Sequence, residues 1–396
     1  MSKFKKENQI LLMLAFFSIS VGLWENFRQL WLEANNFSAT NISNIISIGT
    51  FISVLGIIFV GKYIKLDKLK YFITFTLLIK FFNMLLLLKL NNSLNSALIN
   101  ISIAIDVLTE YIIISSIYPL ITTILKNNTI YSKRKLTEYL FRDVGVLIGG
   151  ILIGKTIIGI SVNYNVCLFL SIIFLGIAII TNVNLRVEKS NEIKKDTKSS
   201  LIKYILKSKI QILYAIYTFI GATAFSTALG LKMLTFTNYL GFSDSSATNY
   251  LLIIGLIADV IGIVALKYLT PKNDYITITI KFVIRFLAYI IAFISDNIII
   301  TLIAITWSIL ISTAYENVCD GYYINEVENE YQLRYTNFRY IIRFLGEAVG
   351  VFLCGLMYEI GLRYMLGLSA FIMIFQLVLA YRLIYIRKKK IGGVEQ

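Results

Sequence analysis

The sequence predicts an all-α integral membrane protein made of two pseudo-symmetric six-helix bundles. The composition is the first reason, because 57% of the 396 residues are hydrophobic and only 15% are charged, whereas soluble domains carry about 25% charged residues. The second reason is that the apolar residues form runs of about 20, the length at which a helix crosses a bilayer. The third is an internal repeat that relates the two halves of the chain.

The apolar runs predict twelve membrane-spanning helices. In the first half they cover 10–32, 40–61, 71–89, 97–119, 136–158 and 164–181. In the second half they cover 210–231, 248–266, 275–294, 298–318, 340–360 and 364–385. A polar, basic segment separates the two sets. The predicted domains are therefore an N-terminal six-helix bundle (1–184), a linker (185–209) and a C-terminal six-helix bundle (210–396).

The distribution of Lys and Arg predicts the orientation. Most of the 38 Lys and Arg residues lie in alternate gaps between the apolar runs, and these gaps include both ends of the chain and the linker. The positive-inside rule places such gaps in the cytoplasm. We therefore expect a multi-pass protein of the cytoplasmic (cell) membrane with both termini cytoplasmic and an uncleaved first span.

The two halves repeat a pattern of cations and glycines. The fifth span reads Arg142-x-x-Gly145-x-x-x-Gly149-x-x-x-x-Gly154, and the same spacing returns in the eleventh span from Arg343 onward. A mid-span Lys80-Phe81 in the third span is matched by Arg285-Phe286 in the ninth. Matches in the same order at nearly the same offset indicate duplication of a six-helix unit.

This organisation resembles the major facilitator superfamily of secondary transporters. The loop after the second span, Gly61-Lys-Tyr-Ile-Lys-Leu-Asp67-Lys-Leu-Lys70, is similar to the superfamily's G-x-x-x-D-R-x-G-R-R signature, with the acid two positions later and the second Gly missing. The fifth span lacks the Gly-Pro of the drug antiporters, so no subfamily is assigned. The resemblance implies that spans one, four, seven and ten line a central cavity in which alternating access moves a solute.

Several function classes are excluded or disfavoured. The chain has no His, which excludes His-based triads and His-ligated metals, and it has no P-loop. Its three Cys residues lie singly in apolar runs and are expected to be buried thiols. The net charge of +15 is spread over loops without a nucleic-acid motif. We expect no enzyme activity, cofactor, metal or nucleic-acid partner, and a monomer whose partners are a small solute, protons and lipid.

The candidate site residues are the polar and ionisable groups inside the spans, because charges at membrane depth are costly and are functional by default. The predicted substrate or proton site comprises Glu25, Asn26, Arg28, Asp106 and Glu110. The predicted structural or gating ion pairs involve Lys80, Arg142, Asp143, Asp259, Arg285, Glu316, Asp320, Arg343 and Glu347.

Glu25 is the leading candidate for contact with substrate or proton. The corresponding segment of the second half, Gly221-Ala-Thr-Ala-Phe-Ser-Thr-Ala, has no acid. As alternatives, Glu25 and Arg28 form an ion pair at i, i+3, or Arg28 extends to the outer interface. Trp24 and Trp31 are then members of an interfacial aromatic belt.

Asp106 and Glu110 lie one turn apart and thus on one face of the fourth span. Two acids in a low-dielectric space cannot both ionise cheaply, so the pair is suited to hold a proton near neutral pH. The alternative is a neutralised pair bridged by Lys80 or Arg142 that fixes the packing of the first bundle.

The remaining charges are interpreted as packing or gating groups. Glu347, one turn after Arg343, is the predicted partner of that cation, and the glycines after Arg142 and Arg343 predict close helix contacts. Glu316 and Asp320 are candidates for an inner gate with Arg343, and Asp259 needs a partner from another helix. Lys80 and Arg285 are expected to point inward to acids.

The sequence therefore favours a secondary active transporter that couples efflux of a small organic solute, cationic or amphipathic, to protons. The first alternative is proton-coupled uptake of a polar nutrient or peptide. The second is a membrane receptor or assembly partner that does not transport.

Overall fold

The computed structural model describes residues 3–392 except 65–67, 91–94, 126–129, 154–155, 158–159, 162–163, 186–204, 206–207, 269–273 and 326–331. Within helices, side chains are not described at 3–6, 118–119, 121–125, 130–136, 262–268, 274–281, 313–325, 332–334, 336 and 387–392. Most of the predicted linker at 185–209 lies outside the described residues, and so do the side chains of Glu316 and Asp320.

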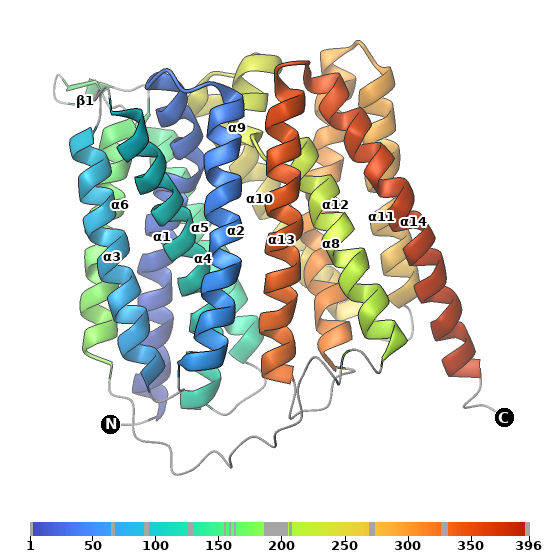
Figure 1. Cartoon of the computed structure of the whole chain (residues 1–396), viewed down its shortest axis with the longest axis horizontal. Coiled ribbons are helices and arrows are strands. Elements are labelled where there is room, and N and C mark those ends of the chain that lie inside the picture. Colours follow the sequence, from blue (N-terminus) through green and yellow to red (C-terminus); the bar gives the residue numbers. More distant parts are fainter. Residues whose placement is uncertain are drawn as a thin grey trace. The chain divides into compact units, whose positions relative to one another are not determined.

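Twelve long helices follow one another in the described part of the chain (Figure 1). The first six are α1 (Lys3–Ala34), α2 (Ala39–Tyr63), α3 (Leu69–Leu90), α4 (Ser96–Leu125), α5 (Ile130–Leu152) and α6 (Tyr164–Val183). The second six are α8 (Lys209–Leu229), α10 (Asp244–Tyr268), α11 (Asp274–Ile294), α12 (Ile298–Asn325), α13 (Gln332–Tyr358) and α14 (Leu362–Gly392). They agree with the predicted spans in number and order, although several extend beyond the predicted ends.

Four short elements were not predicted. A two-stranded hairpin joins β1 (Thr156–Ile157) to β2 (Ile160–Ser161) between α5 and α6. After α8 the chain forms one short turn, α9 (Lys232–Leu234), and then a π-helical turn, η2 (Thr235–Tyr239). Elements this short have no apolar period of their own, so the hydrophobic pattern does not reveal them.

Local chemistry explains how the first two helices are separated. Asn36 adopts a positive φ of 65° just after α1, and the amide of Phe37 donates back to the carbonyl of Leu32, which closes the helix end. Ser38 then caps α2 by accepting a hydrogen bond from the amide of Asn41. The connection is therefore a tight turn between two long helices.

The chain forms two compact units. The first contains residues 1–195 and 232–252. In it α1 packs against α5 and α6, while α4 packs against α2 and α3 (Figure 1). The segment 232–252 joins this unit, because the amide of Met233 donates to Gln29 Oε1 at 3.2 Å and Asn238 Nδ2 donates to Glu33 Oε1 at 2.7 Å.

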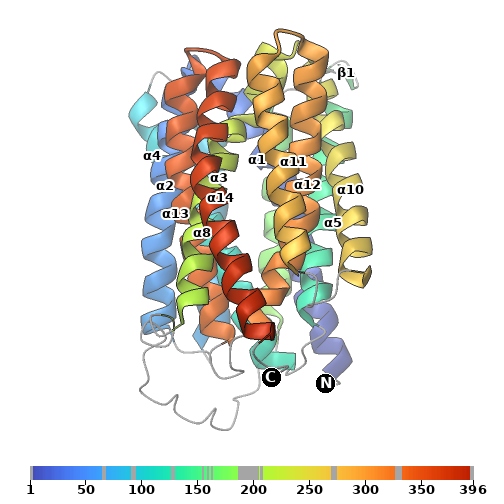
Figure 2. The same cartoon turned by 90° about the vertical axis from the view of Figure 1, so that its right-hand side faces the viewer.

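The second unit contains residues 196–231 and 253–396. In it α8 packs against α13 and α14, and α11 packs against α12 and α14 (Figure 2). Each of these pairs has a counterpart in the first unit: α1 with α5 and α6, and α3 with α4 and α6. The recurring helix pairs confirm the prediction of two pseudo-symmetric helical bundles.

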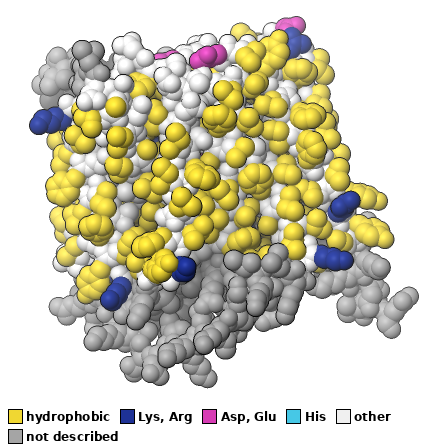
Figure 3. All heavy atoms as spheres, in the orientation of Figure 1, with side chains coloured by type: hydrophobic (Ala, Val, Ile, Leu, Met, Phe, Trp, Pro, Cys, Tyr) yellow, Lys and Arg dark blue, Asp and Glu magenta, His cyan; other side chains and the backbone are white. Residues whose placement is uncertain are grey.

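The outer surface fits a bilayer. Nine helices in the described residues are long and apolar enough to cross a membrane, and two shorter apolar helices accompany them. Large side chains such as Phe51, Phe59, Phe82 and Ile299 are exposed. On the face in Figure 3, hydrophobic side chains cover the middle, and the visible charged side chains lie around its margin. The chain is a multi-pass membrane protein.

Glycines allow the backbones to approach in both units. A Cβ at Gly145 of α5 would overlap the carbonyl oxygen of Ile19 in α1, and a Cβ at Gly346 of α13 would overlap that of Phe219 in α8. These contacts confirm the close approach predicted from the repeated glycine spacing, since only a residue without a Cβ fits there.

We predict that Gly145→Ala destabilises the protein by about 1–3 kcal/mol, because the added methyl group must push α1 and α5 apart. Gly61→Ala is the matched control, since a Cβ at Gly61 meets nothing within 4 Å and Ala favours a helix by about 0.5–1 kcal/mol over Gly. Thermal unfolding of the purified variants measures both. Equal stability of the two variants would show that the α1–α5 contact has room for a side chain.

Candidate functional site

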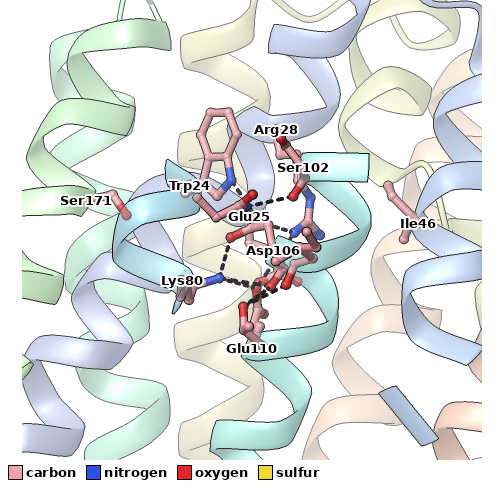
Figure 4. Close-up of polar contacts among 12 residues, drawn as sticks. Trp24, Glu25, Arg28, Ile46, Lys80, Ser102, Asp106, Glu110 and Ser171 are labelled. Atoms are coloured by element: carbon pink, nitrogen blue, oxygen red, sulfur yellow. Dashed lines mark hydrogen bonds and ion pairs between the residues drawn. The ribbon is translucent and has the colours of Figure 1, made fainter. Parts of the chain in front are cut away.

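A network of buried charges joins three helices of the first unit (Figure 4). Asp106 of α4 is its centre and is 0% exposed. Lys80 Nζ of α3 donates to Asp106 Oδ1 at 2.5 Å, and Arg28 Nη1 of α1 donates to Asp106 Oδ2 at 2.9 Å. Both carboxylate oxygens of Asp106 are therefore bound to cations from different helices.

Glu110 completes this network from one turn further along α4. Its Oε2 lies 3.6 Å from Lys80 Nζ and 3.8 Å from Arg28 Nη1. We call Arg28, Lys80, Asp106 and Glu110 the charge network. Two cations balance two carboxylates, so the ionised network is formally neutral. A neutral arrangement is what makes burial of four charges tolerable in a membrane protein.

The sequence positions these groups by helical spacing. Trp24 and Arg28 are four residues apart and so share one face of α1. The indole Nε1 of Trp24 also donates to Asp106 Oδ2, at 3.0 Å. Asp106 and Glu110 have the same four-residue spacing on α4. Sequence reasoning missed the part that Trp24 plays, although its spacing from Arg28 was the available signal.

The structure corrects two alternatives. Arg28 does not extend to an interface, because it is only 6% exposed and is paired with Asp106. Trp24 and Trp31 do not form an interfacial belt, since each is 1% exposed and each indole donates inside the bundle, Trp31 to Asn165 Oδ1 at 3.0 Å. Buried hydrogen-bond acceptors on neighbouring helices outweigh the usual preference of Trp for the interface.

Glu25 lies outside the charge network. It is one residue after Trp24, which turns it about 100° around α1, and it forms an ion pair with Arg142 of α5. The Glu25 side chain is 24% exposed and that of Arg142 is 28% exposed. Lys80 is therefore the predicted cation that bridges Asp106 and Glu110. Arg142, the other cation considered for that role, pairs with Glu25 instead.

Asn26 is a buried neighbour of Glu25 in the sequence. It is 7% exposed, and its Oδ1 accepts no hydrogen bond from the described residues. An orphaned buried amide oxygen costs free energy unless another group meets it.

The other predicted gating residues are scattered. Asp143 follows Arg142 on α5, Asp259 lies on α10, and Arg343 and Glu347 lie one turn apart on α13, all partly buried. Their predicted pairings stay predictions. The gate role of Glu316 and Asp320 falls outside the described side chains.

Arg285 of α11 is buried like its counterpart Lys80, at 4% exposed. Its Nη2 donates to the carbonyl oxygen of Gly221 at 3.0 Å. No acid contacts it among the side chains that the structure describes, so its predicted acidic partner stays a prediction. In that same part of the chain, no group of His, Cys, Asp and Glu side chains could hold a metal ion.

We predict that Lys80→Met lowers the free energy of unfolding by about 3–5 kcal/mol, because it leaves two buried carboxylates with one cation. Adding Glu110→Gln restores neutrality, so the double variant should regain part of that loss. Denaturant or thermal unfolding measures the cycle.

Arg363→Met is the control for this cycle. Arg363 pairs with Asp296 at 2.8 Å, but the two side chains are 48% and 86% exposed, so the loss should be within about 1 kcal/mol. Additive effects of Lys80→Met and Glu110→Gln would mean that the two groups do not share one network.

Several solved structures resemble this chain over nearly its whole length. The nucleoside transporter NupG is 13% identical, with 97% of this chain and 99% of that chain covered and a TM-score of 0.69. The D-xylose-proton symporter is 12% identical, with 95% and 96% covered and a TM-score of 0.65. A variant of the E. coli fucose:proton symporter FucP is 14% identical, with 97% and 99% covered and a TM-score of 0.67.

No protein-family model matches this sequence, and no curated protein matches it. At such low identity the likeness to solved structures concerns the fold alone. The twelve long helices in the described residues, the recurring helix pairs and the coverage of both chains all agree with it. This chain therefore has the fold of the major facilitator superfamily.

Proposed function

We propose that this chain is a secondary active transporter that moves a small organic solute across the cytoplasmic membrane by alternating access, coupled to protons. The fold supports the class, because the solved structures it resembles are transporters of nucleosides, xylose and fucose. The observation that carries the proposal is the set of charges inside the first unit, above all the Glu25–Arg142 pair. Intramembrane ionisable groups mark solute and proton pathways.

Differences in exposure favour Glu25 as the group that exchanges protons with water. Its side chain is 24% exposed, compared with 0% for Asp106 and 6% for Glu110. A proton or a polar solute therefore needs less rearrangement of the first unit to reach Glu25 than to reach Asp106. The charge network instead holds α1, α3 and α4 together, and loss of the Asp106 charge would leave two buried cations with Glu110 as their one acid in the network.

Protonation of Glu25 has a direct structural consequence. The neutral acid loses its charge attraction to Arg142, and that attraction links α1 to α5. The two helices also touch through Gly22 and Gly145, so a change in the pair acts on a tightly packed helix contact. Because a ligand shifts an equilibrium only by binding two states differently, a proton that breaks this pair has the property that coupling requires.

The direction of transport is best supported as uptake of a polar solute together with protons. In the sequence, aromatic side chains beside Glu25 favour efflux of a cationic or amphipathic solute, because the faces of aromatic rings attract cations. The two indoles are instead buried and hydrogen-bonded within the first unit, which removes that support. Two of the solved structures above are proton symporters. Proton-coupled efflux remains the second candidate.

We predict that Glu25→Gln abolishes solute-driven proton movement while preserving solute exchange. The amide still accepts a hydrogen bond but carries no titratable proton. The measurement uses proteoliposomes that contain a pH-sensitive dye, screened with sugars, nucleosides, peptides and organic cations. Counterflow of the active solute, which needs no net proton movement, shows that the variant is folded and still binds.

Glu33→Gln is the matched control. Glu33 is an exposed acid two turns further along α1, and a glutamine oxygen there can still accept from Asn238 Nδ2. It should behave like the unchanged protein. Unaltered proton movement in Glu25→Gln would remove Glu25 from the coupling mechanism.

A strain that lacks this chain separates the directions. We expect lost growth on one polar nutrient as sole source, because the proposed symporter supplies it. Hypersensitivity to a toxic compound would favour efflux. A non-transporting receptor predicts neither effect, and no solute in the screen would then move protons.

A further inference from the structure

A second polar cluster lies inside the second unit, away from the charge network. It consists of Arg285 and Tyr289 on α11, Ser308 and Ser312 on α12, and Gln376 on α14, and we call it the Arg285 cluster. Each of these side chains belongs to a residue at most 5% exposed. The two residues on α11 are one turn apart, as are the two on α12, so each pair shares a helix face.

The hydrogen-bonding capacity of this cluster is largely unused by the described residues. A guanidinium has five N–H donors. Besides the bond to the Gly221 carbonyl oxygen at 3.0 Å, Arg285 has two contacts at 3.5 Å, to Ser312 Oγ and Gln376 Oε1, which is the outer limit for a hydrogen bond. Arg285 Nε has no partner among these residues.

Two hydroxyl groups beside Arg285 are also unsatisfied. Tyr289 and Ser308 are neighbours, and both are 0% exposed. Their hydroxyls are close enough to interact with each other, but within the described part of the chain neither makes a hydrogen bond of normal geometry. Buried hydroxyls normally have partners. The cluster thus combines one positive charge with several hydrogen-bond donors that lack a good acceptor among the described residues.

Arg285 differs from Lys80 in the charge of its described partners. Lys80, at the equivalent place on α3, faces two carboxylates. The described partners of Arg285 are all neutral, and they include the ring of Phe225 at 5.9 Å. A buried cation without a counter-charge costs several kcal/mol, so a negative charge at this place would stabilise the second unit.

We propose that the Arg285 cluster binds a small anion, either chloride or the carboxylate group of a small solute. The planar guanidinium suits a carboxylate, and the hydroxyls of Tyr289, Ser308 and Ser312 supply neutral donors around it. One Arg matches one negative charge, and the tight burial of all five residues admits only a small group. This site lies outside the proposed proton pathway and does not depend on it.

The test is the thermal unfolding of the purified full-length protein in uncharged nanodiscs, titrated with sodium chloride or sodium acetate against sodium sulfate at equal ionic strength. We expect a saturable rise in Tm with one or both monovalent anions. Arg285→Gln should abolish the rise, and Arg363→Gln, which changes an exposed Arg, should keep it. A rise with chloride alone identifies an inorganic anion, and a rise with acetate alone identifies a carboxylate. No rise, or an equal rise in Arg285→Gln, overturns the proposal.

Tyr289→Phe keeps the proposal testable if Arg285→Gln fails to fold. Removal of a buried hydroxyl without a described partner should leave Tm in sulfate unchanged or higher, while several-fold more anion should be needed for half of the Tm rise. An unchanged anion requirement would contradict the cluster as the binding site.

Glu316→Gln tests the competing explanation, an internal counter-charge. Glu316 stands one turn after Ser312 on α12, with its side chain outside the described set. We expect the anion response to be the same in this variant and in the unchanged protein. An anion response that appears only in Glu316→Gln would mean that Glu316 neutralises Arg285, and the proposal would fail.

Discussion

The structure of the first unit depends on the neutralisation of Asp106. This carboxylate is fully buried and receives Lys80 on one oxygen and Arg28 on the other, with the Trp24 indole as a third donor. Three helices meet at one side chain because an ion at that depth must be paired. The pairing of Arg28 and Lys80 with Asp106 fixes how far α1 and α3 can slide along α4. Apolar packing alone would restrict this sliding less.

Glu25 is part of the same helix but lies outside the charge network and pairs with Arg142. One residue separates it from Trp24, so α1 presents buried donors on one face and a partly exposed acid on the next. Its partner, Arg142, belongs to the turn of α5 whose backbone lies against Gly22. The partly exposed acid is thus joined to a helix contact with no spare volume. Such a contact has few intermediate arrangements, which suits a change between two states.

Much of the fold could be predicted from sequence because a bilayer constrains it strongly. Apolar runs near 20 residues predict spanning helices, and the spacing of Gly145 and Gly346 predicts where backbones touch. The partners of Arg28 and Trp24 could not be predicted, since helical spacing tells which residues share a face and not which helix that face meets. The short turns α9 and η2 could not be predicted for a different reason: they continue an apolar run and have no hydrophobic period of their own.

The two units share a scaffold of helix pairs but differ in their described charges. Both use glycines to bring the first and fifth helices of each repeat together, and both place a cation at the middle of the third. In the first unit that cation, Lys80, is neutralised from within by Asp106 and Glu110. In the second, Arg285 has only neutral contacts among the described side chains. Among the described side chains, the buried cation of the first unit meets acids and that of the second meets neutral groups, so the two units differ in chemistry where they agree in packing.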